Sequence, residues 1–91
     1  MSSRKPLIKR LLLDVLKPRE IPTIEIPKKI CEIDGISHVT VVVTEVDART
    51  ETLKVTVRGD DICYEKVASI LQKEGCVVRS VDEVEVGTNE I

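Results

Sequence analysis

The segments that decide the fold are Ile30-Cys-Glu-Ile-Asp-Gly35 and Ile70-Leu-Gln-Lys-Glu-Gly75, which end alike and each precede a valine-rich run. Their final glycines, at positions 35 and 75, lie 40 positions apart, and the same offset places Leu13 on Leu53. Self-similarity at this period indicates repeated structural units. Two copies are too few for a solenoid, so we interpret the repeat as a duplicated supersecondary unit.

The second copy of the repeat reads as a strand followed by a helix. Residues 53–58, Leu-Lys-Val-Thr-Val-Arg, alternate between apolar and polar side chains, which is the period of a half-buried strand. Apolar side chains within residues 67–74 then recur at helical spacing. Asp60 or Asp61 can cap the start of this helix by accepting a bond from a free backbone N–H. Gly75 offers the left-handed residue that ends it.

The last strand opens at Val77, and its apolar phase slips near residues 82–83, which predicts a β-bulge or a strand end there. The strand of the first copy is harder to assign, because residues 7–16 fit one face of a helix as well as a strand. Pro6 and Pro18 flank this run, and it matches the clear strand of the second copy. Both observations favour a strand.

The rest of the first copy completes the pattern. A helix is predicted around Ile26, Ile30 and Ile33, which are spaced by four and three residues. His38–Val46 is rich in β-branched residues and predicts the next strand. Residues 47–50 then form the turn that leads into the second copy.

The order βαββαβ with right-handed crossovers predicts an α+β domain of the ferredoxin-like type, a four-stranded antiparallel sheet with two helices on one face. One such domain accounts for residues 1–91, with residues 1–6 and 87–91 expected to be flexible tails. The residues expected to face the helices are Leu11, Leu13, Val15, Val39, Val41, Val43, Leu53, Val55, Val57, Val77 and Val81. Those expected on the other side of the sheet, the open face, are Arg10, Leu12, Asp14, Leu16, Thr40, Val42, Thr44, Val46, Lys54, Thr56, Arg58, Val78, Ser80 and Asp82.

The open face carries more apolar side chains than a solvated sheet face normally does. Leu12 and Leu16 come from the first strand, and Val42 and Val46 from the second. Apolar patches of this kind mark interaction surfaces. We therefore predict a homo-oligomer whose contacts bury part of these four residues.

Charged residues are predicted between these apolar ones. Asp14 and Asp82 belong to neighbouring strands, and by phase they share the open face with Lys54 and Arg58. Cross-strand neighbours stand ~4.5–5.5 Å apart at Cβ, so opposite charges here can pair. Two interpretations remain open: an ion-pair network that fixes the register of an assembly, or a polar ligand or metal site built on the same charges.

A second group of acidic residues lies in the predicted loops. Glu45 and Asp47 flank the hairpin turn, and Asp60 and Asp61 precede the second helix. Oxygen-rich loops of this kind can bind Ca²⁺ or Mg²⁺. The residues lack the D-x-D-x-D-G spacing of a dedicated calcium loop, so solvated charge and helix capping are the alternative.

Composition excludes several functions. The net charge of −2 gives no general attraction for nucleic acid or acidic membranes, and Tyr64 is the only aromatic residue, so the open face cannot stack bases. No apolar run approaches the ~20 residues of a membrane span.

Cys31, Cys63 and Cys76 form no C-x-x-C pair, which is typical of buried, reduced thiols in a cytoplasmic protein. His38, the only histidine, lacks the partners of a catalytic triad. The single Asn and single Gln suit a thermophilic source.

Four short segments resemble an archaeal family, the domain-of-unknown-function family 211. They are Leu-Asp-Val-Leu-Lys-Pro at 13–18, Val-Thr-Glu-Val-Asp at 43–47, Gly-Asp-Asp-Ile at 59–62 and Ser-Val-Asp-Glu-Val at 80–84. The resemblance spans nearly the whole chain. It implies a ferredoxin-like domain that assembles into a closed homo-oligomeric ring of about six or seven subunits. It implies no activity, so no functional residues are carried over.

Three functional hypotheses follow. The leading one is a homo-oligomeric regulatory or ligand-binding module, similar in its βαββαβ plan to ACT domains, that binds a small molecule or a metal ion at subunit interfaces. The second is an enzyme whose active site is assembled from charged residues at subunit interfaces. That hypothesis requires a titratable group with a strongly shifted pKa in a cleft. The third is a purely structural assembly protein.

Overall fold

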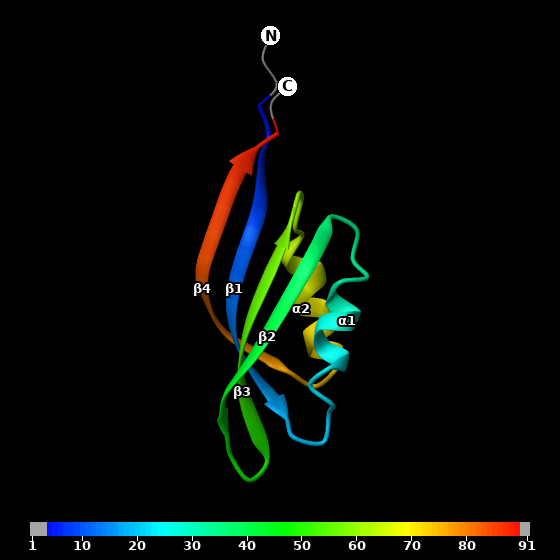
Figure 1. Ribbon diagram of the computed structural model, residues 1–91, viewed down its shortest axis with the longest axis vertical. Helices are drawn as coiled ribbons and strands as arrows, with labels where there is room; N and C mark the ends of the chain where they lie inside the picture. The colour runs from blue at the N-terminus through cyan, green and yellow to red at the C-terminus, as the bar shows by residue number, and fades with distance from the viewer. Residues whose placement is uncertain (1–3, 90–91) are drawn as a thin grey trace.

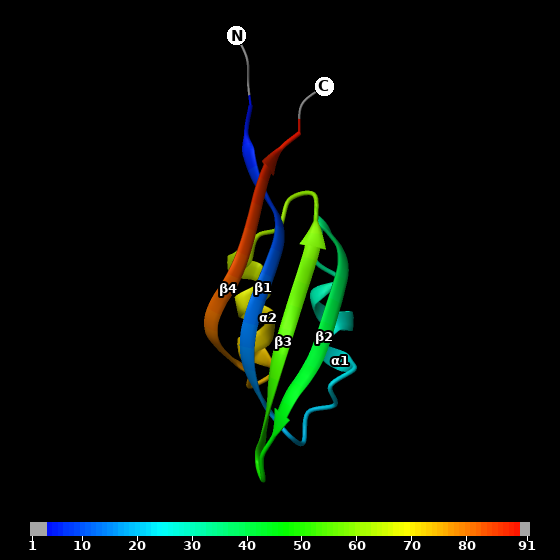
Figure 2. The ribbon, with the colours of Figure 1, turned by 60° about the vertical axis from the view of Figure 1, so that its left-hand side comes forward.

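The computed structural model describes residues 4–89. In chain order the elements are β1 (Pro6–Pro18), α1 (Glu25–Ile30), β2 (Ile36–Val46), β3 (Thr50–Gly59), α2 (Tyr64–Lys73) and β4 (Val77–Thr88). The four strands form one antiparallel sheet in the order β2-β3-β1-β4. Both helices lie on the same side of this sheet (Figure 1), and Figure 2 shows the open face toward the viewer. The predicted ferredoxin-like α+β fold is confirmed.

The strands extend well beyond the helices. β1 has 13 residues and spans roughly 43 Å, whereas α2 has 10 residues and spans roughly 15 Å. The β1–β4 ribbon therefore projects at the end where the termini lie, and the β2–β3 hairpin projects at the other end (Figure 1). The principal extents are 56 × 22 × 17 Å. The two helices, of which α1 has only 6 residues, cover the middle of one face. Among the helices of residues 4–89, none is long and apolar enough to cross a membrane.

The core lies between the sheet and the two helices. Alternate residues of β1 and β3 point into it, because successive side chains of a strand face opposite sides. A fully buried aliphatic side chain contributes about 1.5–3 kcal/mol, so this layer supplies most of the apolar stabilisation. Its residues are Leu11, Leu13, Val15, Ile26, Ile30, Leu53, Val55, Val57, Ile62, Val67, Leu71 and Cys76.

One lysine is buried beside this core. The Lys17 side chain is 1% exposed, and its Nζ donates to the Pro18 carbonyl at 2.9 Å and to the Ile21 carbonyl. Its third contact is the Glu51 carboxylate, with Nζ 3.1 Å from Oε1. Thr23 Oγ1 also donates to this Glu51 oxygen at 3.1 Å. We call Lys17, Glu51 and Thr23 the lysine clasp. It ties the connection between β1 and α1 to the start of β3.

The end of α2 follows the prediction, but its start does not. Gly75 adopts φ +81°, and the N–H groups of Gly75 and Cys76 donate back to the carbonyls of Gln72 and Leu71. This Schellman pattern satisfies the last carbonyls of the helix. The predicted cap at Asp60 or Asp61 is wrong. In the described chain the N-cap is Cys63, which makes no side-chain hydrogen bond, and the helix begins two or three residues later than expected.

Asp60 and Asp61 instead contact the other repeat glycine. Their backbone N–H groups both donate to the Gly35 carbonyl, at 3.0 and 3.3 Å. Gly35 adopts φ +93°, and a Cβ placed there would lie 2.2 Å from the Asp61 carbonyl oxygen. Only glycine therefore permits this close approach of two loops.

β4 departs from strict alternation at two points. Its register against β1 shifts so that Arg79 and Asp82 are extra residues, and the second shift confirms the predicted bulge. The first shift moves Val78 opposite Val15, where it packs against the core, and leaves Val77 56% exposed opposite Leu16. The predictions that Val77 faces the helices and Val78 the open face are therefore wrong.

β2 also contains an extra residue, Thr44. Beyond it Val46 lies opposite Glu51, on the side of the sheet that carries the helices, so its predicted place on the open face is wrong. Val43 lies opposite Leu53 on the predicted side, but it remains 41% exposed because the hairpin extends past the helices.

The strands reach further toward the termini than predicted. Pro6 pairs with Thr88 and Leu7 with Gly87, so Pro6, Gly87 and Thr88, which were predicted to lie in the tails, belong to the sheet. The remaining predicted tail residues include positions 1–3 and 90–91, which lie outside the described residues.

Candidate functional site

Four charged side chains of alternating sign meet on the open face. Lys54 Nζ lies 2.8 Å from Asp82 Oδ2 and 3.3 Å from Asp14 Oδ2. Arg79 donates to Asp14 Oδ1 through Nη2 at 2.9 Å and through Nε at 3.2 Å. We call Asp14, Lys54, Arg79 and Asp82 the charge cluster. Each of its charges contacts at least one opposite charge.

Strand register brings the cluster together. Asp14 of β1 lies directly opposite Lys54 of β3, and Ser80 of β4 lies on its other side. Asp14 and Lys54 are also equivalent positions of the repeat, 40 residues apart, so the internal axis of the duplication passes between them. The cluster thus lies at the centre of the sheet. Two hydroxyl groups complete it, since Ser80 Oγ donates to Asp82 Oδ1 at 2.6 Å and Arg79 Nη2 donates to Thr52 Oγ1 at 3.3 Å.

The two bulges of β4 supply half of the cluster. Strict alternation from Val77 would turn Arg79 toward the helices, so sequence reasoning missed it as a site residue. The extra residue in the strand turns the guanidinium onto the open face instead. Bulges commonly re-aim side chains in this way next to functional sites. The phase slip near residues 82–83 marks the bulge at Asp82, and no comparable slip in the sequence marks the bulge at Arg79.

Arg58 does not join the cluster, although sequence analysis grouped it there. It is exposed and lies opposite Arg10 on one side and His38 on the other. Within residues 4–89 its guanidinium makes no ion pair with a cluster member, and its carbonyl accepts a bond from Ser37 Oγ at 3.2 Å. Arg10 pairs with Glu83. Of the four residues predicted to share this site, the fold therefore brings three together and leaves Arg58 apart.

The ion pairs move the pKa values of the cluster away from neutrality. The hydrogen bonds from Arg79 lower the pKa of Asp14, with a further contribution from Lys54. The hydrogen bond from Lys54 lowers the pKa of Asp82, with help from Ser80. The pKa of Lys54 is raised, chiefly by its hydrogen bond to Asp82. At neutral pH all of these groups are therefore charged.

Apolar side chains surround the cluster. Leu12 and Leu16 are half-buried on β1, whereas Val42 on β2 and Val77 on β4 are 52% and 56% exposed. Val46 is 54% exposed but lies on the other side of the hairpin. The open face therefore combines a charged centre with an apolar border.

The four acidic residues of the predicted loop site are not brought together. Glu45 and Asp47 lie at the β2–β3 hairpin, whereas Asp60 and Asp61 follow the opposite end of β3. Across residues 4–89, no group of three or more His, Cys, Asp or Glu side chains is placed to hold a metal ion.

The thiols and the histidine are scattered. Cys76 is buried, and burial raises its pKa. Cys31 is exposed and Cys63 half-buried, so the prediction of buried thiols holds for Cys76 alone. His38 is exposed, with Nδ1 3.0 Å from Ser37 Oγ.

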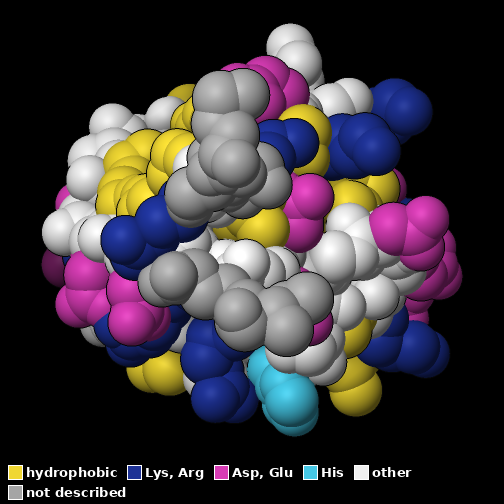
Figure 3. Space-filling view, turned by 90° about the horizontal axis from the view of Figure 1, so that it is seen from above, with side chains coloured by type: hydrophobic (Ala, Val, Ile, Leu, Met, Phe, Trp, Pro, Cys, Tyr) yellow, Lys and Arg dark blue, Asp and Glu magenta, His cyan; other side chains and the backbone are white. Residues whose placement is uncertain are grey.

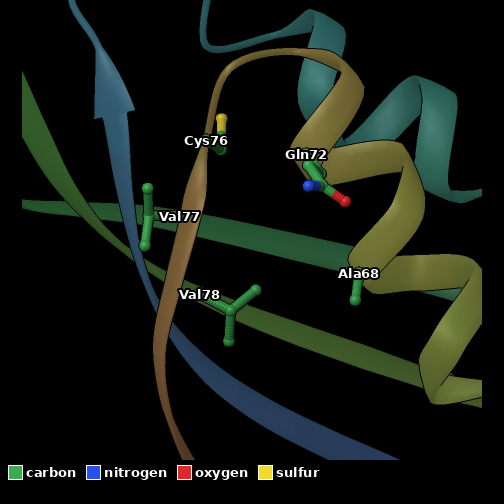
Figure 4. Close-up of a pocket in the computed structure, with 5 residues that line it drawn as sticks. All are labelled: Ala68, Gln72, Cys76, Val77 and Val78. Carbon is green, nitrogen blue, oxygen red and sulfur yellow. The ribbon is translucent and has the colours of Figure 1, made fainter.

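A shallow groove of about 260 Å³ lies between α2 and the start of β4 (Figure 4). No pattern in the sequence predicts this groove. Its lining is mostly apolar, and the thiol of Cys76 is its only titratable group. The lining residues are Ala68, Gln72, Cys76, Val77 and Val78.

Charge elsewhere on the surface is mixed. Seen from the end that carries the termini, acidic and basic side chains alternate around the molecule (Figure 3). Side chains of both signs are interspersed on the face that this view shows.

Comparison with known proteins identifies the family. The model of domain-of-unknown-function family 211, described as an uncharacterized ArCR family, matches residues 9–91. The chain belongs to this family. An uncharacterized protein of Methanocaldococcus jannaschii is 34% identical to this chain over 80 residues. The match covers 88% of this chain and 82% of the relative. The resemblance found in the sequence is confirmed. The family 211 description names no reaction or ligand, so function must be argued from the open face.

Proposed function

We propose that this family 211 protein is a homo-oligomeric regulatory module that binds a small polar ligand or a divalent cation where the open face meets another copy. The observation that carries the proposal is the charge cluster itself. It collects four charges and two hydroxyl groups from three strands at the centre of an apolar-bordered face.

The open face has the charge balance and the apolar border expected of an interface with a second copy of the chain. The cluster has two cations and two anions in alternation, so its net charge is zero and the face can meet an equivalent face without net repulsion. Leu12, Leu16, Val42 and Val77 supply the apolar border. Isologous contacts require this kind of self-complementary patch.

Coverage would change the energetics of the cluster. On a solvated sheet, such ion pairs contribute little. Once another copy excludes water, each charge must keep a partner or gain a ligand, because an unpaired buried charge is costly. A small polar molecule or ion that bridges the clusters of two copies would therefore couple its own binding to assembly.

A second candidate, a purely structural assembly role, is favoured by the completeness of the pairing. Every member of the charge cluster already has a partner in its own chain. Such a network can fix the register of an assembly without any ligand.

The enzyme hypothesis gains no support from the cluster. A general acid or base works best with a pKa near the operating pH. Here the pKa values of Asp14 and Asp82 are lowered and that of Lys54 is raised, so each moves away from neutrality.

The test compares Asp14→Asn and Asp82→Asn with the wild type. Mass is measured by light scattering and melting temperature is measured with and without Mg²⁺ or Ca²⁺ and candidate small polar metabolites. We expect both variants to weaken assembly and to lose the ligand-induced rise in melting temperature. Glu85→Gln, on the same exposed strand but outside the cluster, serves as the control.

The outcomes separate the candidates. Weakened assembly in the variants, with no ligand response even in the wild type, supports the structural role. Wild-type mass, stability and ion response in both variants would make the open face ordinary surface and sink the proposal.

A further inference from the structure

The charge cluster is a chain of ion pairs with two open ends. Arg79 contacts Asp14, and Asp14 contacts Lys54. Lys54 then contacts Asp82. The two end members have one oppositely charged contact each, whereas the two inner members have two. Positive and negative charges therefore alternate along the chain, which begins at a guanidinium group and ends at a carboxylate.

The guanidinium end has unused donors. Arg79 Nε and Nη2 donate to Asp14 Oδ1, and Nη2 also donates to Thr52 Oγ1. A guanidinium group has five N–H groups, so these bonds leave the N–H groups of Nη1. Within residues 4–89 these have no acceptor. Because Thr52 is only 7% exposed, the guanidinium is held from a buried side, and its free edge has a fixed orientation.

The carboxylate end has unused acceptors. Asp82 Oδ2 accepts a hydrogen bond from Lys54 at 2.8 Å, and Oδ1 accepts one from Ser80 at 2.6 Å. Each oxygen of an ionised carboxylate has about two lone-pair sites, so each oxygen keeps room for a further donor. The Asp82 side chain is 33% exposed. A cation can therefore reach this carboxylate without displacing Lys54.

The bulges of β4 set the spacing of the two ends. Arg79 falls between the ladder pairs of β1 residues 14 and 15, and Asp82 falls between those of residues 12 and 13. The ends thus lie roughly 7 Å apart along the strand. An α- or β-amino acid fits this spacing, because its ammonium and carboxylate groups are close together and each can add a hydrogen bond of about 2.9 Å.

We propose that the charge cluster binds a small amino acid as a zwitterion, with the ligand carboxylate at Arg79 Nη1 and the ligand ammonium at Asp82. This rests on the proposed function, because the charge cluster is its ligand site. A zwitterion continues the alternation of charge at both ends and keeps the net charge of the cluster at zero. A simple anion or cation fills one end only and adds an unbalanced charge, which is costly where water is excluded.

The apolar border next to the guanidinium end favours an aliphatic side chain on the ligand. Leu16 of β1 lies opposite Val77 of β4, two residues before Arg79, and Val77 is 56% exposed. A ligand side chain that packs on this pair removes apolar area from water. L-leucine is therefore the probe for the site.

The first test compares L-leucine with its two halves by isothermal titration calorimetry. 4-Methylpentanoate lacks the ammonium group, and 3-methylbutylamine lacks the carboxylate. We expect L-leucine to bind at least about ten-fold more tightly than either half, because a hydrogen bond between charged groups is worth that factor. Equal affinities for the three compounds, or no binding of L-leucine, would overturn the inference.

Two variants assign the ends. Arg79→Gln should lose the preference for L-leucine over 3-methylbutylamine, because the carboxylate contact is gone. Asp82→Asn should lose the preference for L-leucine over 4-methylpentanoate, because the ammonium contact is gone. Arg58→Gln, on the same face but outside the cluster, is the control and should keep both preferences. A variant at either end that is folded by circular dichroism and keeps its preference would contradict the assignment.

The same measurements separate this inference from the proposed function. A rise in melting temperature with Mg²⁺ or Ca²⁺ that Asp14→Asn abolishes, without any preference for L-leucine over its halves, supports the proposed function and overturns the zwitterion site. Wild-type mass, stability and ion response in both Asp14→Asn and Asp82→Asn overturns the proposed function itself.

Discussion

The sheet carries an ion-pair network on each face, and the two differ in their access to water. The lysine clasp lies on the helix side, where the Lys17 side chain is 1% exposed and Glu51 is 17% exposed. The charge cluster lies on the open face, where the side chains are 21–44% exposed. Both use the same chemistry. Burial decides their roles, because desolvated charges must stay paired whereas solvated ones can separate at little cost.

Hydrogen-bond saturation sharpens this contrast. The Lys17 ammonium has three N–H donors, and Pro18, Ile21 and Glu51 accept them all. The Lys17 ammonium therefore has no N–H left for a ligand, and the clasp holds the β1–α1 connection in place. The charge cluster keeps a solvent-facing side, where another molecule can approach. Function is therefore to be sought on the open face and stability in the clasp.

The largest expected effect comes from the buried side. Lys17→Met keeps the aliphatic stem but leaves the Ile21 carbonyl without the ammonium donor, while the Pro18 carbonyl keeps only its bond from the Ile21 N–H. An unsatisfied buried acceptor costs about 1–3 kcal/mol, so we expect the free energy of unfolding to fall by about that amount. Urea denaturation followed by circular dichroism measures the change. Lys29→Met is the control, since its ammonium pairs with Glu74 at the surface, 2.8 Å away. A Lys17→Met as stable as the control would show that the clasp is dispensable.

A smaller effect of the clasp appears on acidification. Hydrogen bonds from Lys17 and Thr23 lower the pKa of Glu51 below its ordinary value of 4.5. A carboxylate whose pKa is lower in the folded state contributes stability above the unfolded pKa, and this contribution is lost as pH falls through the folded pKa. The wild type should therefore lose stability below about pH 4.5 more steeply than Glu51→Gln. Denaturation midpoints from neutral pH to pH 3 measure the difference. Parallel curves would mean that Glu51 has the same pKa in both states.

The comparison also shows how far sequence patterns can predict this molecule. Alternation in β1 and β3 predicted the core and the pairing of Asp14 with Lys54, because both strands keep a strict two-residue period. The place of Arg79 could not be predicted, since a single extra residue reverses the face of its neighbours and leaves only a local phase slip. Lys17 was missed for a different reason. Its position in the alternation points inward, but a lysine is expected at the surface unless its partners are known.

Loop contacts were beyond prediction for a similar reason. Asp60 and Asp61 have the residue type of a helix cap, yet their backbone groups bond to Gly35, a residue distant in sequence. Local capping signals cannot register such a long-range contact.

The smallest expected change in melting temperature of the isolated chain comes from a substitution in the charge cluster. How this change depends on salt is the informative measurement. Asp14→Asn removes a carboxylate that contacts both Lys54 and Arg79. If the open face is solvated, added salt screens these contacts, and the difference in melting temperature between wild type and variant should shrink toward zero. The Lys17→Met difference should persist in high salt, because a buried pair is screened much less.

Measurements at different protein concentrations distinguish a solvated charge cluster from one that is covered by another copy. Dilution should uncover the open face by mass action if copies cover it. We therefore expect the effect of Asp14→Asn to be small and salt-sensitive in dilute protein and to grow at concentrations where light scattering shows assembly. Thermal melts across a concentration series, at low and high salt, measure this growth. An effect that is equally large at every concentration and insensitive to salt would place the cluster in a desolvated environment within the single chain, and the contrast between the two faces would then fail.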